Sequence, residues 1–308
     1  MLPHCLICNS EDVGEHLKAN DYITKEEFTL YLCKKCHVGF TYPQPMNINL
    51  YYPTGYRRFT APVKWLLKKF YNLRAKNWIR KLGSSGRVLE VGCGSGWMLK
   101  ALHDQGWEVV GLERTEEEAR FASSITGLRV ISGTLEEIKS ETYDLIILFN
   151  VLEHMTDPID VLCQCRRLLK EKGTIILSMP NLSSLQARFN GPSWFHLDVP
   201  RHLFHFSRQS LTNAFEIAGF HITHLKYISL IHDVYGWVQS LLNILGFEQN
   251  RLTKGLMGDN RRLDLISPSG LIMVMIAILS VIPSVLLFLG SWVISSGAII
   301  EIWAKKKD

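Results

Sequence analysis

The chain has 308 residues, with 34 Lys and Arg against 29 Asp and Glu and a formal net charge of +5. This length allows one large core with appendages, because single domains usually run to ~100–200 residues. The basic residues are spread out except for short pairs, which favours solvated faces over a nucleic-acid groove. The first twenty residues lack the apolar core of a signal peptide, and seven cysteines, four of them in two C-x-x-C pairs, indicate a reducing cytosol rather than a disulfide framework.

Two cysteine pairs dominate residues 1–45, a segment that we call the leader. Cys5 and Cys8 are separated by 24 residues from Cys33 and Cys36, and the intervening sequence is hairpin-like. Four thiolates at this spacing can surround one zinc ion and leave no open coordination position, so we predict a structural zinc site. The metal would supply folding free energy that a ~45-residue segment lacks. The alternative is four unrelated buried cysteines.

Residues 46–82 are expected to form a helical linker between the leader and the rest of the chain. Apolar residues from Trp65 to Ile79 recur at roughly helical spacing, which predicts a helix over 62–81. Before this helix, Tyr51, Tyr52 and Tyr56 can act as a lid over a ligand or as aromatic anchors that pack the leader onto the core.

Residues 88–96 read VLEVGCGSG, which predicts a short apolar strand, a glycine turn and the start of a helix at Trp97. Glycines let the main chain approach a ligand closely, and the helix start offers unpaired N–H groups. A dinucleotide-binding turn requires a third glycine where Trp97 stands, so the spacing departs from that motif. Glu113 follows Gly92 by 21 residues and ends an apolar run, where a carboxylate can accept both hydroxyls of a ribose.

The segments that follow alternate as in an α/β domain with a parallel sheet. We predict strands at 87–91, 107–112, 128–132, 143–149 and 174–179, with helices at 97–105, 115–125 and 158–170. A helix at 207–219 and a sixth strand at 220–230 complete the predicted core, which spans 83–230. The last segment, 299–308, consists of an antiparallel seventh strand at 299–305 and a basic tail. Right-handed crossovers would bring to one sheet edge Glu90, the glycine turn, Glu113, the 133–136 turn and Asn150.

At these residues the chain resembles the class I S-adenosylmethionine-dependent methyltransferases. Glu90, Gly92, Gly94 and Gly96 match the E/D-x-G-x-G-x-G motif of that family without a gap. The resemblance implies a Rossmann-like seven-stranded sheet, methyl transfer, and S-adenosylmethionine as the cofactor. It also implies contacts from Gly92 and Gly94 to the methionine moiety, from Glu113 to the ribose, from Thr134, Leu135 and Glu136 to the adenine, and from the main chain of Asn150 to the methionine group. The leader resembles the zinc-binding leader of some bacterial sugar and glycolipid methyltransferases.

Residues 193–206, which we call the acceptor segment, read SWFHLDVPRHLFHF. They follow the fifth strand, where the resemblance places a substrate-binding insertion. An oxygen acceptor must give up a proton, and the base that we hypothesise is His202, or failing that His154, oriented by Asp198 or Arg201. His154 can instead be a structural hydrogen-bonding partner. The three histidines and the aspartate of the segment also fit a metal site, although methyl transfer needs no metal.

Residues 265–300 contain no charged side chain, and Pro283 divides them. One membrane crossing needs ~20 residues and two need ~40, so we predict that 231–298 form an apolar helical hairpin dipping into one leaflet. Basic residues on both sides should keep both ends cytoplasmic, so the protein would be a peripheral or monotopic protein of the inner membrane. These flanking residues are Arg251, Lys254, Arg261, Arg262, Lys305, Lys306 and Lys307. A buried helical pair or a dimer interface is the soluble alternative.

The sequence therefore predicts a membrane-associated methyltransferase that acts on a lipid-linked acceptor, such as a polyprenyl-linked sugar, a glycolipid or a quinone. The alternative within enzymes is an RNA methyltransferase that docks through its zinc ribbon, which the scattered basic residues do not favour, so we expect no nucleic-acid partner. A scaffold that binds the cofactor without methyl transfer is the non-enzymatic alternative. We expect a chelator to unfold the leader and to leave cofactor binding largely intact.

Overall fold

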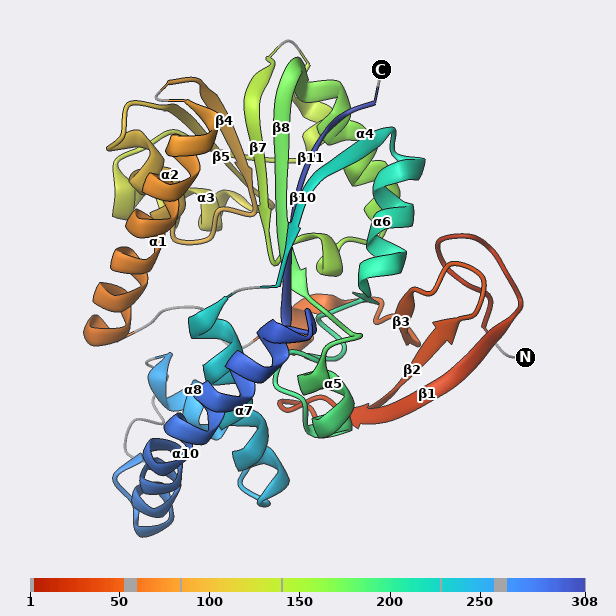
Figure 1. The fold of residues 1–308 in the computed structure, drawn as a ribbon, viewed down its shortest axis with the longest axis vertical. Helices are drawn as coiled ribbons and strands as arrows, with labels where there is room; N and C mark the ends of the chain where they lie inside the picture. The colour runs from red at the N-terminus through yellow and green to blue at the C-terminus, as the bar shows by residue number, and fades with distance from the viewer. Residues whose placement is uncertain are drawn as a thin grey trace.

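Two β-sheets and a projecting group of helices make up the fold (Figure 1). The computed structural model describes residues 3–52, 60–83, 85–139, 141–227, 229–257 and 265–307. Tyr56, a candidate lid residue, and Arg261 and Arg262, candidate flanking charges, lie outside the described residues.

The larger sheet has seven strands in the order β10-β11-β8-β7-β4-β5-β6. The parallel strands are β4 (Arg87–Val91), β5 (Glu108–Glu113), β6 (Val130–Ser132), β7 (Tyr143–Phe149) and β8 (Leu169–Pro180). β11 (Ile299–Lys306) lies antiparallel between β8 and β10 (Phe220–Lys226). The predicted Rossmann-like seven-stranded fold is confirmed, including the closing strand that returns to the sheet after a long insertion.

Helices cover both faces of this sheet, because its central strands are apolar on both sides. α1 (Ala61–Leu82), α2 (Trp97–His103) and α3 (Glu116–Thr126) pack on one face. α4 (Pro158–Leu168) and α6 (Arg208–Ile217) pack on the other. Side-chain caps begin two of these helices, since Thr115 and Asp157 accept hydrogen bonds from the first turns of α3 and α4.

The smaller sheet joins the leader to the acceptor segment. β1 (Val13–Asn20), β2 (Glu27–Cys33) and β3 (Gly39–Tyr42) form an antiparallel meander. β9 (Phe204–His205) pairs with β3, and the Thr41 hydroxyl donates to the His202 carbonyl at 2.7 Å. The sequence predicted the hairpin but not β9, because a two-residue strand inside an aromatic segment leaves no alternating pattern.

The apolar insertion folds into α7 (Leu230–Ile244), α8 (Arg251–Leu256) and α10 (Pro268–Val293), which we call the helical unit. It projects from the end of the sheet where the parallel strands finish (Figure 1). The prediction that Pro283 splits the apolar run into two arms is wrong, because α10 is one continuous helix and packs against α7. Interior prolines persist in apolar helices where the neighbouring structure compensates the one lost hydrogen bond. Among the described helices, α10 is the one long and apolar enough to cross a membrane.

Short helices occupy the remaining connections. They are η1 (Ile48–Tyr51), η2 (Leu135–Glu137), η3 (Leu152–His154), α5 (Leu185–Asn190) and η4 (Gly191–Ser193). The sixth strand ends at Lys226 rather than at 230, since α7 begins at Leu230.

Candidate functional site

The glycine turn connects β4 to α2 at the sheet edge where the parallel strands end. Gly92, Gly94 and Gly96 have φ values of 64°, 58° and 67°, which residues with a Cβ rarely adopt. A Cβ on Gly92 would lie 2.6 Å from Val151, whereas a Cβ on Gly94 would meet nothing within 4 Å. Gly94 therefore borders open space, where a ligand can approach the main chain. Gly96 instead serves as the N-cap of α2.

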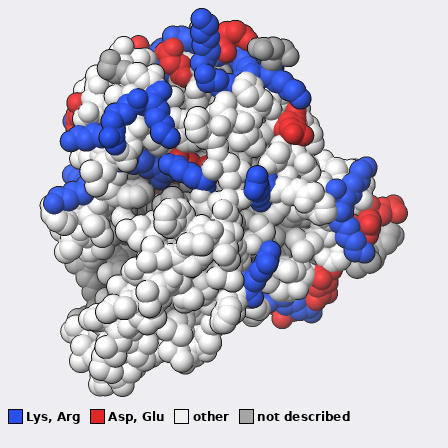
Figure 2. All heavy atoms as spheres, in the orientation of Figure 1, with Lys and Arg blue, Asp and Glu red and all other residues white. Residues whose placement is uncertain are grey.

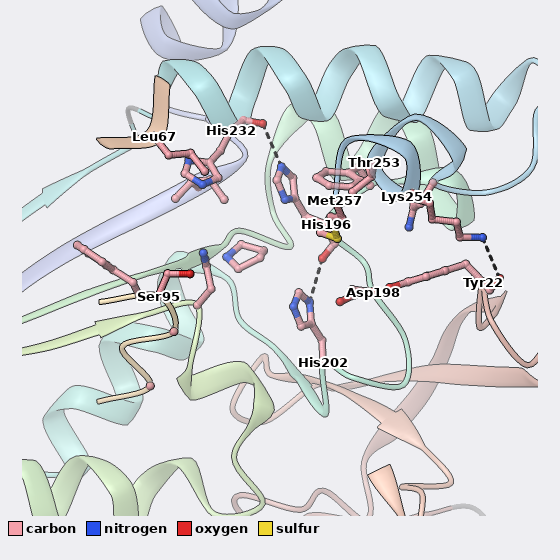
Figure 3. Close-up of a pocket in the computed structure, with 18 of the residues that line it drawn as sticks. Tyr22, Leu67, Ser95, His196, Asp198, His202, His232, Thr253, Lys254 and Met257 are labelled. Atoms are coloured by element: carbon pink, nitrogen blue, oxygen red, sulfur yellow. Dashed lines mark hydrogen bonds between the residues drawn. The ribbon is translucent and has the colours of Figure 1, made fainter. Parts of the chain in front are cut away.

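A cavity of about 420 Å³ runs along this turn (Figure 3). Figure 3 shows Ser95 on one side of the cavity, Tyr22 and Lys254 on the opposite side, and His202 between them. The catalytic core contributes to its wall Glu90, Gly92, Gly94, Ser95, Phe149 and Asn150. The leader, the acceptor segment, α1 and the helical unit also contribute to the wall. A concave site of this size is typical of small-molecule binding.

Two carboxylates lie near the turn. Glu90 lines the cavity, is only 3 % exposed, and has one carboxylate oxygen without a hydrogen-bond partner among the described residues. Burial, with the charge of Glu113 adding to it, raises the pKa of Glu90 to about 8. Glu113 accepts a hydrogen bond from the Gly94 N–H. An unsatisfied carboxyl group beside an open glycine fits a ligand that carries positive charge, as S-adenosylmethionine does on its sulfonium and amino groups.

The other predicted cofactor residues divide into two groups. Asn150 follows β7, has a positive φ of 50° and lines the cavity. Thr134, Leu135 and Glu136 follow β6 outside the cavity wall, and the Leu135 carbonyl accepts a hydrogen bond from Arg167 at 2.9 Å. The structure thus brings the glycine turn and the end of β7 to the cavity. The three residues predicted to contact the adenine do not line it.

His202 and Asp198 are the two predicted catalytic residues that line the cavity. The His202 Nδ1–H donates to the His196 carbonyl at 3.0 Å, which leaves Nε2 as the proton-accepting nitrogen of the neutral ring. Burial, followed by the positive charge that His154 can carry, lowers the pKa of His202 well below its usual range. His202 is therefore neutral near pH 7, as a general base must be before it accepts a proton.

His154 and Arg201 lie behind the cavity wall. The His154 Nδ1–H donates to the Arg201 carbonyl at 2.8 Å, and its ring centroid lies 4.7 Å from that of His202. The buried Arg201 guanidinium donates to Asp198 and to Asp21, at 2.8 Å in each case. Arg201 thus orients Asp198 rather than His202, and His154 supports the main chain of the acceptor segment.

Glu153, His154 and His202 form a cluster that the sequence did not predict. One donor atom from each lies within 4.8 Å of the others, so the three side chains can hold a metal ion. Apart from the leader zinc site, the sequence suggested a metal only within the acceptor segment, because η3 and that segment are distant in the chain. Their proximity follows from tertiary packing, in which the Leu203 N–H donates to the Glu153 carbonyl at 2.8 Å.

The four leader cysteines come together as predicted. Cys5 Sγ lies 3.6 Å from Cys36 Sγ, Cys8 Sγ lies 3.6 Å from Cys33 Sγ, and all four sulfur atoms lie within 4.8 Å of one another. A tetrahedral zinc ion with Zn–S bonds of about 2.3 Å requires sulfur atoms about 3.8 Å apart, so this donor set fits zinc. The cluster lies at one end of β2, and the β1–β2 turn at the other end reaches the cavity wall through Tyr22.

A family model described as a methyltransferase domain matches residues 66–225, just over half of the chain. The ubiquinone biosynthesis O-methyltransferase of Aliivibrio fischeri is 36 % identical over 103 residues, which cover 31 % of this chain and 44 % of the relative. The protein of the same name from Proteus mirabilis is 34 % identical over 121 residues, which cover 37 % and 46 %. The chain thus spans less than half the length of these curated relatives.

The fold is also found among solved structures. A proposed sarcosine dimethylglycine methyltransferase from Galdieria sulphuraria aligns with a TM-score of 0.51 at 15 % identity, covering 81 % of this chain and 92 % of that one. At this identity the similarity shows the fold alone. The family model, by contrast, spans the glycine turn and the acceptor segment. The chain therefore belongs to the methyltransferase-domain family.

Proposed function

We propose that this enzyme methylates an oxygen atom of a lipid-linked acceptor at the cytoplasmic face of the inner membrane. The observation that carries the proposal is one cavity that runs from the glycine turn past His202 to α1, α7 and α8. The curated relatives named for ubiquinone biosynthesis support a quinone-type acceptor. A polyprenyl-linked sugar or a glycolipid would combine a polar hydroxyl with an apolar chain in the same way.

The cofactor is proposed to lie along the glycine turn, with the main chain of Gly92 and Gly94 against its methionine moiety. When bound, S-adenosylmethionine supplies an electrophilic methyl group on its sulfonium. The Glu90 carboxyl group lies in the wall of this part of the cavity and favours a positively charged ligand once it is ionised. The remaining proposed contacts are Glu113 to the ribose hydroxyls, Asn150 to the methionine group through its main chain, and Thr134, Leu135 and Glu136 to the adenine edge.

His202 is the proposed general base. The acceptor oxygen forms a bond to the methyl carbon as the sulfur–carbon bond breaks, and the hydroxyl proton passes to Nε2 of His202. The His196 carbonyl holds the ring in the tautomer that this step requires. Asp198, oriented by Arg201, lines the same wall and can accept a hydrogen bond from a second polar group of the acceptor. The positive charge of the sulfonium therefore moves to the ring of His202, which becomes an imidazolium.

The leader is proposed to be a zinc-stabilised wall of the acceptor site. Zinc on the four cysteines would hold one end of β1 and β2, while the turn at the other end shapes the cavity. We divide the chain accordingly into the leader at 1–45, the linker at 46–82, the methyltransferase core at 83–230, the apolar insertion at 231–298 and the closing strand at 299–308.

Turnover of the purified full chain tests this proposal. The demethylated cofactor should accumulate when S-adenosylmethionine and extracted membrane lipid are both present, and should not accumulate without lipid. Turnover with RNA in place of lipid would identify an RNA methyltransferase instead. Cofactor binding by calorimetry without turnover on either would identify a non-catalytic scaffold.

A further inference from the structure

The polarity of α10 is the reverse of that of a helix in a water-soluble protein. Its outer faces carry large apolar side chains such as Ile278, Ile282 and Val293, which are 66–77 % exposed. Its buried positions recur every three or four residues and are mostly small: Gly270, Met273, Ala277, Ser280, Ser284, Phe288 and Ser291. A helix in water buries its large apolar residues, whereas a helix in lipid packs on its neighbours through small ones.

Both ends of α10 are held by the rest of the protein. At the start of α10, the Arg251 guanidinium donates to the hydroxyls of Ser267 and Ser269, at 3.2 Å in each case. Beyond its end, the Leu185 N–H donates to the Ser296 carbonyl at 3.1 Å, and the chain then enters β11. The 26 residues between form a helix about 39 Å long. Contacts at both ends favour an orientation of α10 along one leaflet over one that carries an end across a bilayer.

α1 supplies the charge that an anionic leaflet attracts. It contains seven Lys and Arg and no Asp or Glu. In its first half Trp65 is 60 % exposed, and the Lys69 ammonium lies 3.9 Å from the centre of the Trp65 ring. The Thr60 N–H donates to the Leu256 carbonyl at 3.2 Å, so α1 begins beside α8, which packs on α7 and α10. Exposed Trp beside Lys is typical of membrane interfaces.

The charge distribution on the surface agrees with this orientation. Figure 2 shows a broad white area over the helical unit, at the lower left, with Lys and Arg along its upper border. An apolar surface with a basic border matches the hydrocarbon and the anionic head groups of a leaflet, in that order. A second copy of the chain could cover the apolar area, but it would carry the same basic border and repel the first.

The same elements line the outer part of the cavity. Leu67 comes from α1, His232 from α7, and Met257 directly follows α8. Figure 3 shows these three residues above Ser95 and His202. An apolar chain that leaves the cavity between α1 and α8 therefore reaches the apolar surface without crossing water.

We propose that α10 and the first half of α1 dock on an anionic bilayer, with α10 in the plane of one leaflet, and that the acceptor enters the cavity sideways between α1 and α8. Docking stands independently of the acceptor's identity. Sideways entry rests on the proposed function, because it requires an acceptor whose apolar chain stays in lipid while its hydroxyl reaches His202.

Flotation of the full chain with vesicles tests docking. Wild type should float with mixed phosphatidylcholine and phosphatidylglycerol vesicles, and the double variant Ile278→Glu, Ile282→Glu should bind about tenfold more weakly. The matched control is Ile217→Glu, which is 63 % exposed on α6 and should float like wild type. A wild-type chain that stays in the soluble fraction, as a monomer or as a dimer, overturns docking.

Two acceptors with one head group test sideways entry. A catechol with a long isoprenoid chain is embedded in vesicles, and a short-chain catechol is supplied in solution. The double variant should methylate the embedded catechol about tenfold more slowly than wild type, and the soluble one within about twofold of it. Equal rates on the embedded catechol overturn sideways entry. If wild type floats and binds the cofactor yet methylates neither catechol, the proposed quinone-type acceptor fails and docking stands.

Discussion

Asp21, in the turn between β1 and β2, lies 2.8 Å from Arg201, and neither side chain is exposed to solvent. The same guanidinium donates to Asp198, which lines the cavity, and to the carbonyl of Tyr51 in the linker. One buried cation therefore connects the leader, the linker and the acceptor segment. The leader is therefore a structural part of the cavity wall.

Replacing Asp21 with Ala should lower the free energy of unfolding by ~3–5 kcal/mol, because it leaves the buried Arg201 with one carboxylate partner fewer. Urea unfolding measures the change. The matched control is Asp12→Ala, which breaks an exposed ion pair with Lys34 and should cost less than ~1 kcal/mol. Equal losses in the two variants would show that Arg201 does not need its leader partner.

Replacing His202 with Gln should slow single-turnover methyl transfer by ~10²–10⁴-fold, because the acceptor proton loses its base. His154→Ala should have a smaller effect, since His154 acts through the Arg201 carbonyl. His221→Ala, on the exposed side of β10, is the control and should behave like wild type. If the His202 and His154 variants both react within about threefold of the wild-type rate, neither histidine is the general base.

Cofactor affinity should increase with pH up to about 8 because of Glu90. Its pKa is raised by burial and by Glu113, so below about 8 the carboxyl group holds a proton in the free enzyme. A positively charged ligand binds the ionised form better, so binding must release that proton, and the affinity falls by up to about tenfold for each pH unit below the pKa. Calorimetry between pH 6 and 9 checks this. Glu90→Gln should bind with the same affinity at every pH once the titration of the ligand itself is subtracted, and a persisting slope would contradict the assignment.

Chelation should release one zinc ion per chain and abolish methyl transfer, while S-adenosylmethionine still binds. The reason is spatial, since Tyr22 and Ile23 of the leader line the cavity away from the glycine turn, which belongs to the larger sheet. Metal analysis, activity and calorimetry on one sample separate these effects. Cys33→Ser should reproduce the loss, and Cys163→Ser, an exposed cysteine on α4, should retain both metal and activity. Loss of cofactor binding together with the metal would contradict this division of the site.

Local patterns were sufficient to predict most of the catalytic core. Alternating apolar and polar runs predicted the parallel strands and their helices, because these signals act within a few residues. The β3–β9 pairing was not predictable, since a two-residue strand becomes ordered only through its distant partner. The continuity of α10 through Pro283 was also missed, because a proline signals a break only where nothing compensates its lost hydrogen bond.

The glycine-turn side of the cavity was easier to predict than the opposite side. Gly92 and Gly94 belong to a contiguous motif whose backbone requirements appear in the sequence itself. Tyr22 and Leu67 carry no such local signature, because each reaches the cavity from an element that packs against the core only in the folded state. Glu153 was overlooked for the same reason, as its proximity to His202 depends on contact between segments far apart in the chain.

β11 lies between β8 and β10, yet its residues follow α10 along the chain. A ribosome therefore synthesises all 26 residues of this apolar helix before it synthesises the strand that closes the sheet. During this interval the nascent polypeptide presents a lipid-seeking segment attached to a half-assembled domain, which is prone to aggregate unless the segment is shielded. If α10 docks on a bilayer as proposed, we expect the bilayer to act as that shield while the last strand is added.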